Sequence, residues 1–135
     1  MVPQEVVIDS IEGRSLRFWN KQSQDADQIW AYDVTATLET GVITQRVWDT
    51  GHALAAFFRS LADEEPRFEG VREFGTLEGD LLIEARAEGL GHLRIDVTLT
   101  HHVPPTASLS MLMTLGAGAH VTRIASDLEQ FCAST

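Results

Sequence analysis

Two adjacent histidines, His101 and His102, are the residues of this chain that come nearest to suggesting a reaction, because imidazoles are common metal ligands and general bases. They stand in the stretch THHVPPT, at the end of a β-branched run and just before Pro104 and Pro105. Side chains alternate across a strand, so the two imidazoles are expected on opposite faces and cannot easily share a metal ion. The pattern favours a strand that ends in a proline turn, with His101 at the margin of the core.

The other candidates for chemistry are similarly isolated. His52 and His120 each stand at the start of a predicted helix without an acid at a spacing that would orient them, which favours capping or packing. The stretch TLGAGAH lacks the third glycine and the Lys-Ser/Thr pair of phosphate loops, so Gly116 and Gly118 indicate a sharp turn. Cys132 is expected to be a half-buried structural thiol. We therefore predict no catalytic residue, no cofactor and no metal ligand.

Length and composition indicate an ordinary globular domain. The chain has 135 residues, 44% of them hydrophobic and 22% charged, which predicts one domain over residues 1–135 with a core of its own. The single cysteine cannot form an intramolecular disulfide. No basic and apolar leader and no run of eighteen apolar residues stands out, so we expect a cytoplasmic location.

The chain is strongly acidic, with a formal net charge of −10 and an isoelectric point near 4.7. This charge opposes binding to nucleic acid and to anionic membranes. Nine carboxylates and three arginines lie between Asp63 and Glu88. This segment is either a solvated surface that keeps the protein soluble or a docking surface for a basic partner. The residues predicted to bind such a partner are Asp63, Glu64, Glu65, Glu69 and Glu73.

Period-two patterns predict eight strands joined largely by hairpins. The clearest are residues 29–41, with Trp30, Tyr32, Val34, Ala36 and Leu38 on one side, and residues 91–102, with Leu93, Ile95, Val97 and Leu99 inward. The remaining predicted strands lie within residues 5–13, 15–22, 42–48, 68–79, 80–89 and 106–116. In the second of these segments Trp19 falls on the face opposite Leu16 and Phe18, so it is an interface candidate unless that face is covered.

Two stretches change to a period near 3.6 and predict helices. Leu54, Phe57, Phe58 and Leu61 form an apolar stripe over residues 50–64, with Asp49 or Thr50 available as the N-cap. The second helix spans about residues 119–132, and its stripe consists of Val121, Ile124, Leu128 and Phe131.

The order of these elements predicts an α+β fold: a mainly antiparallel sheet of about eight strands with two helices packed on it. The two halves also resemble each other. SIEGRSL at 10–16 matches TLEGDLL at 76–82, DVT recurs at 33–35 and 96–98, and a glycine and a histidine open both helices. The spacings are 66, 63 and 68 residues. They indicate either an internal ββββα duplication or chance similarity of short stretches.

The second half resembles a family of small bacterial domains of unknown function, which is similar in turn to immunity proteins of the WapI type. The resemblance rests on residues 91–131, on DLLIEARAEG before them and on the helical stretch LAAFFRSLA, and it runs from about Asp33 to Phe131. Some relatives have an aromatic residue where this chain has Leu109 or Met111. The resemblance implies a protein without enzymatic activity that binds and neutralises a toxin, for which a basic nuclease domain is a natural target.

Two hypotheses for function follow from the sequence. The first is an acidic binding protein, an immunity protein in the more specific form, which docks a basic protein through the surface between Asp63 and Glu88. The alternative is a small-molecule-binding protein or enzyme with a pocket between sheet and helices, where His92, Asp96 or His101 would act. The sequence does not predict an oligomeric state.

Overall fold

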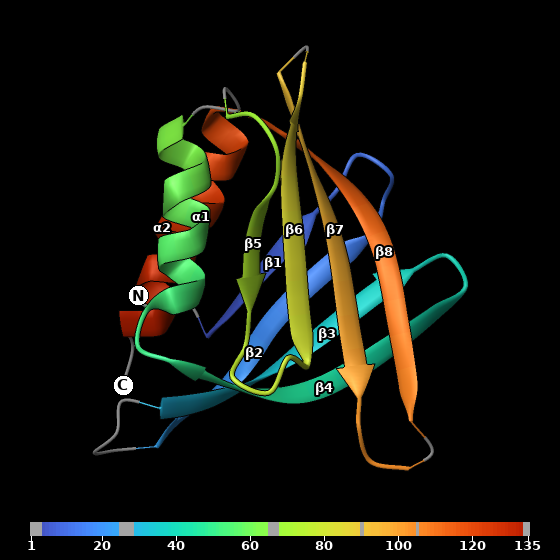
Figure 1. The fold of residues 1–135 in the computed structure, drawn as a ribbon. Helices are drawn as coiled ribbons and strands as arrows, with labels where there is room; N and C mark the ends of the chain where they lie inside the picture. The colour runs from blue at the N-terminus through green and yellow to red at the C-terminus, as the bar shows by residue number, and fades with distance from the viewer. Residues whose placement is uncertain (1–3, 25–28, 65–67, 90, 105, 134–135) are drawn as a thin grey trace.

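The computed structural model describes residues 4–24, 29–64, 68–89, 91–104 and 106–133, drawn as a ribbon in Figure 1. Four strands and a helix are followed by four more strands and a second helix. No helix among the described residues is long and apolar enough to cross a membrane. The first half contains β1 (Glu5–Asp9), β2 (Ser15–Gln24), β3 (Ile29–Leu38), β4 (Gly41–Thr50) and α1 (Ala53–Glu64). The second contains β5 (Arg72–Gly75), β6 (Leu81–Glu88), β7 (His92–His101), β8 (Ala107–Gly116) and α2 (Ala119–Ala133).

The predicted α+β fold with antiparallel strands and two helices is confirmed. The eight strands form two antiparallel sheets, β1-β2-β3-β4 and β5-β6-β7-β8, each in chain order. In Figure 1 the sheets lie one behind the other with crossing strands, and the two helices lie side by side next to β5. One core cluster includes buried residues from both sheets and both helices.

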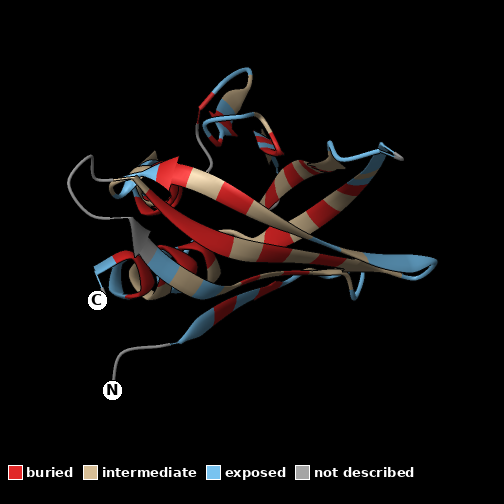
Figure 2. Ribbon diagram, turned by 90° about the horizontal axis from the view of Figure 1, so that it is seen from below, coloured by how far each residue is buried: buried red, intermediate tan, exposed pale blue. Residues whose placement is uncertain are grey.

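The inner faces of the sheets follow the alternation in the sequence. Trp30, Tyr32, Val34 and Ala36 of β3 are buried, and the residues between Tyr32 and Ala36 that face the other way are half-buried. The inward residues of β7 are buried in the same alternating manner, from Leu93 to Leu99. Figure 2 shows the resulting bands of buried and less buried residues along the strands. Each sheet therefore buries one face against the other sheet and the helices.

Helix α1 begins three residues later than the predicted residue 50. Strand β4 continues to Thr50, and the first amide bond of the helix runs from Ala56 N–H to the carbonyl of His52, 2.8 Å away. The predicted N-cap role of Asp49 or Thr50 is therefore wrong. Asp49 instead lies in the strand with its side chain 2% exposed, because it accepts hydrogen bonds inside the core. The apolar stripes of both helices are buried as predicted.

The two halves correspond at an offset of 66 residues in every pair of elements except β3 and β7, which correspond at 63. The correspondence includes reciprocal contacts between the sheets. Ile11 N–H donates to the carbonyl of Thr114 over 2.9 Å, and Leu77 N–H donates to the carbonyl of Trp48 over 3.0 Å. Both members of these two bonds differ by 66 in number. The structure is consistent with the ββββα repeat.

The turns and helix starts obey the same offset. Gly13 and Gly79 both have left-handed backbones, with φ of 85° and 72°. The first-turn bond of α1, from Ala56 to His52, has its counterpart in the bond from Thr122 to Gly118. His52 and His120, which differ by 68, therefore do not occupy corresponding positions. That part of the sequence similarity is coincidental, whereas the matches at 66 and 63 coincide with the structural repeat.

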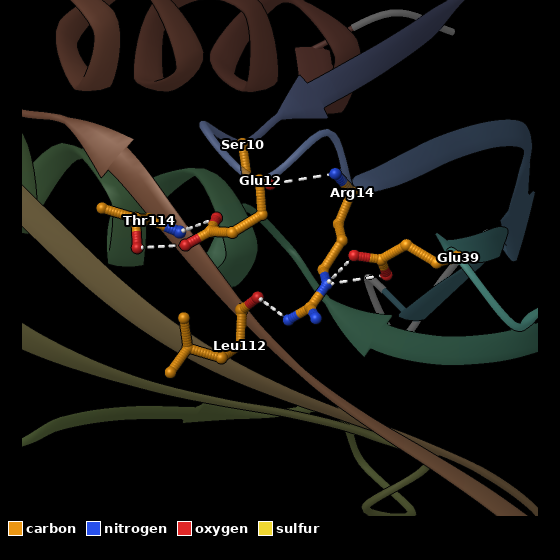
Figure 3. A network of polar contacts seen from close by, with 6 residues as sticks. All are labelled: Ser10, Glu12, Arg14, Glu39, Leu112 and Thr114. Carbon is orange, nitrogen blue, oxygen red and sulfur yellow. Dashed lines mark hydrogen bonds and ion pairs between the residues drawn. The ribbon is translucent and has the colours of Figure 1, made fainter.

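The turn between β1 and β2 closes one edge of the second sheet (Figure 3). The carboxylate of Glu12 accepts bonds from the backbone N–H of Thr114, at 2.8 Å, and from its hydroxyl, at 2.6 Å. Arg14 donates to the carbonyl of Leu112 at 2.8 Å and pairs with Glu39 at 3.1 Å. These bonds occupy backbone groups of edge strand β8 that would otherwise be open to another chain.

Replacing Glu12 by glutamine should lower the free energy of unfolding at pH 7 by about 1 kcal/mol, a modest figure because the carboxylate is exposed. Partial desolvation raises the pKa of Glu12, but the hydrogen bonds from Thr114 outweigh it and lower the pKa from 4.5 to about 2. A lowered pKa means that the stabilisation is present above pH 4.5 and is lost as the pH falls toward 2.

Urea denaturation at pH 7 and near pH 2.5 measures this difference. The two proteins should differ clearly at the higher pH and converge at the lower one. Glu39→Gln, which removes only an exposed partner of Arg14, is the matched control and should cost less than Glu12→Gln at pH 7. An equal loss for Glu12→Gln at both pH values would contradict the role of its ionised carboxylate.

Candidate functional site

The two adjacent histidines bind different partners. His101 Nδ1 lies 2.6 Å from Oε1 of Gln45 on β4, which connects the two sheets. His102 Nε2 lies 2.8 Å from Oδ1 of Asp80, a buried carboxylate in the turn before β6. This second contact has the distance of an ion pair, although Asp80 Oδ1 has no well-aligned hydrogen-bond donor among the described residues. The predicted divergence of the two imidazoles is confirmed, and both hold turns and strands in place.

The histidine at the start of α2 has a capping role, as predicted. Nδ1 of His120 accepts the backbone N–H of Gly116 over 3.1 Å, which requires that nitrogen to be unprotonated. Burial lowers the pKa of His120, nearby Arg123 lowers it further, and Asp9 opposes the change. Gly118 makes the turn between them with a φ of 74°. This neutral imidazole therefore completes the turn from β8 into α2.

The core contains one polar pair that the sequence did not single out. Tyr32 donates its hydroxyl proton to Oδ2 of Asp49 over 3.0 Å, and Asp49 Oδ1 accepts the N–H of Thr50 over 2.9 Å. Burial raises the pKa of Asp49, and these two bonds offset part of the rise. Burial likewise raises the pKa of the Cys132 thiol to about 11, so this thiol is protonated at neutral pH. These groups are satisfied or inert rather than poised for catalysis.

The residues of the alternative hypothesis are not gathered in one place. His92 and Asp96 lie on the outer face of β7, whereas His101 lies on the other face and contacts Gln45. Asp96 is engaged by Arg94, with Arg94 Nε 3.3 Å from Asp96 Oδ2. Among the described residues no group of three histidine, cysteine or acidic side chains is arranged to hold a metal ion.

The predicted acidic residues have different environments. Asp63 is exposed at the end of α1, and Glu69 and Glu73 are exposed before and within β5. Glu64 is instead paired with Arg72 at 2.8 Å. This hydrogen-bonded ion pair lowers the pKa of Glu64. Glu65 lies outside the described residues. Only some of the predicted acidic surface is therefore free to meet a partner.

A row of carboxylates crosses the outer face of the second sheet. Glu73 of β5 stands directly opposite Glu84 of β6, and Glu84 stands directly opposite Asp96 of β7. Asp96 has Arg94 as a partner, but within the described part of the chain Glu73 and Glu84 form no ion pair. Like charges at directly opposite positions destabilise a sheet. Glu84 and Asp96 were not among the predicted residues, because their alignment with Glu73 depends on the strand register.

A hollow of about 380 Å³ lies between these two unpaired carboxylates, at the outer surface of β5 and β6. Leu82, whose side chain is 45% exposed, and Gly75 form part of its lining. A Cβ atom added to Gly75 would lie 2.9 Å from Cδ2 of Leu82, so a larger residue would crowd the hollow. The surface thus combines two negative charges with an apolar floor.

The model of a family of unknown function, DUF6228, matches residues 7–135, so the chain belongs to that family. No curated protein and no solved structure matches the chain. The predicted membership in a family of unknown function is confirmed. No comparison supports the more specific likeness to immunity proteins of the WapI type.

Proposed function

We propose that this protein binds a basic protein partner without catalysing a reaction, and that it docks this partner on the outer face of the second sheet. The observation that carries the proposal is the directly opposed pair Glu73 and Glu84, which has no cation in the described structure. The free protein bears the cost of this repulsion. A partner that inserts a lysine or arginine between the two carboxylates would relieve it.

The hollow beside the pair fits the chemistry of such a side chain. The exposed Leu82 can cover the aliphatic stem of a lysine or arginine, while its charged end meets Glu73 and Glu84. The net charge of −10 would also steer a basic partner toward the protein over a longer range. In its more specific form, the proposal is that the partner is a toxin and that this protein is the immunity protein that masks it.

The test begins with affinity capture from cells that also express the products of neighbouring genes, followed by a dissociation constant for the captured partner. Glu73→Gln/Glu84→Gln should weaken binding by about 10- to 100-fold. The same change should leave the fold intact and raise its stability by roughly 0.2–1 kcal/mol, because it removes a like-charge contact. Stronger folding together with weaker binding is the expected combination.

Asp9→Asn/Asp127→Asn is the matched control, because it removes the same amount of charge from β1 and α2. It should change the affinity by less than about threefold. Equal weakening by both double substitutions would mean that only the net charge matters and would remove this face from the proposal. Hydrolysis or modification of the captured partner by the protein would contradict binding without catalysis.

A further inference from the structure

A second hollow, of about 410 Å³, lies on the outer face of the first sheet, away from the acidic row. It is lined by Gln4, Glu5, Arg17, Trp19 and Asn20, from β1, β2 and the residue before β1. Its volume is within the range of small-molecule sites in proteins. Trp19 therefore lies on the outer face of its strand, as the sequence predicted, but in a hollow rather than on a flat surface.

The strand that carries this hollow is irregular at one point. Trp19 pairs with Asp33, but the next paired residues are Gln22 and Ala31, which marks a β-bulge. Asn20 within the bulge has a φ of 54°, and it is the one residue other than glycine with a positive φ in the described ranges. Such a conformation costs roughly 1 kcal/mol or more and is found preferentially at functional sites. Bulges likewise redirect side chains next to binding sites.

The side chains of the hollow are held in position before any ligand arrives. The indole Nε1 of Trp19 donates to Thr35 Oγ1 over 3.0 Å, and the guanidinium of Arg17 lies 4.3 Å from the indole ring centre. Arg17 also pairs with Glu5. The amide of Asn20 donates to Asp33 over 2.9 Å. A site with fixed side chains loses less conformational entropy when it binds a ligand.

The charges of this face cancel locally, which distinguishes it from the rest of an acidic chain. Glu5 and Arg17 neutralise each other, and Asp33 is neutralised in the same way by Arg46 at 2.9 Å. A free phosphate or a free cation would therefore meet no unbalanced charge. The carboxamides of Gln4 and Asn20 can still donate and accept hydrogen bonds, and the indole offers an apolar surface.

We propose that this hollow binds an uncharged sugar unit. A pyranose ring presents hydroxyl groups around its rim and an apolar C–H face, which matches planar polar side chains arranged around a tryptophan. The site would be independent of the partner surface on the other sheet. The two proposals can therefore fail separately.

The probes are neutral di- and trisaccharides of glucose, galactose, mannose, xylose and N-acetylglucosamine, with adenosine and inorganic phosphate for comparison. We expect at least one saccharide to shift the backbone amide resonances of β1 and β2 in the ¹⁵N-labelled protein. Trp19→Ala should weaken that saccharide by about tenfold or more. Gln4→Ala, at an exposed position outside the strands, should weaken it without affecting the fold.

Trp48→Ala is the matched control, because Trp48 is half-buried on β4 and does not line the hollow. It should leave saccharide binding unchanged. The proposal is overturned if no saccharide shifts these resonances, if the shifts persist in both Trp19→Ala and Gln4→Ala, or if adenosine or phosphate binds here in place of a saccharide.

Discussion

Replacing Phe131 by alanine should lower the free energy of unfolding by about 3–5 kcal/mol. This side chain near the end of α2 is 1% exposed. Its ring centre lies 5.7 Å from that of Trp30 and 6.3 Å from that of Tyr32, so it packs the second helix onto β3 of the first sheet. Alanine would leave a cavity among three aromatic rings and remove a contact between the two halves.

Chemical denaturation of the wild type, Phe131→Ala and Phe131→Leu measures this effect. Leucine fills part of the space and should cost less than alanine. Gln130→Ala is the control, since Gln130 is the exposed neighbour on the same helix, and it should change stability by less than about 0.5 kcal/mol. A loss below about 1 kcal/mol for Phe131→Ala would contradict the packing of α2 on the aromatic cluster.

Asp49→Ala should cost about 2–4 kcal/mol, because it leaves the hydroxyl of Tyr32 and the N–H of Thr50 without an acceptor in the core. Asp49→Asn should cost less at pH 7, since an amide oxygen can still accept the bond from Tyr32. At the corresponding positions of the second half, offset by 63 and 66, stand Ile95 and Leu115. The polar pair is therefore particular to the first half.

The pH dependence of these variants follows from the direction of the pKa shift. Burial raises the pKa of Asp49, so the folded protein holds the proton more tightly than the unfolded chain. The contribution of Asp49 to stability consequently falls as the pH rises from about the unfolded value of 3.8 through the folded value. The advantage of wild type over Asp49→Asn should be larger at pH 4 than at pH 7 in urea denaturation. An advantage that grows toward pH 7 would contradict the raised pKa.

The local pattern of the sequence was enough to predict the elements and their buried faces. Alternation from Leu93 to Leu99 and the stripe from Leu54 to Leu61 each determine which side must leave water, whatever the rest of the fold. The parity of His101 and His102 followed from the same rule. Hairpin-length links between strands also predicted that neighbours in sequence would pair antiparallel.

Features that depend on contacts between distant segments could not be predicted in this way. The division of eight strands into two sheets depends on packing of the halves, which no local pattern encodes. The start of α1 was misplaced because Asp49, a good N-cap residue, is used by Tyr32 inside the core. The acidic row requires the registers of Glu73 with Glu84 and of Glu84 with Asp96, which are set by turns and bulges rather than by composition.

The sequence repeat is more informative now that its offsets can be compared with the structure. Matches at 66 and 63 residues fall on corresponding strands and turns, and the bonds from Ile11 and Leu77 close the two sheets in the same manner. The surfaces of the halves have nevertheless diverged. The outer face of the first sheet is locally neutral and carries Trp19, whereas that of the second carries unpaired Glu73 and Glu84. Different ligands for the two faces are a natural result.

The account depends most on the outer face of the second sheet being the docking surface. Amide chemical-shift mapping of the ¹⁵N-labelled protein with its captured basic partner tests this directly. We predict that the largest shifts and line broadening fall on β5, β6 and β7 around Glu73, Glu84 and Asp96. Perturbations confined to the first sheet or to the helices, with this row unchanged, would contradict it.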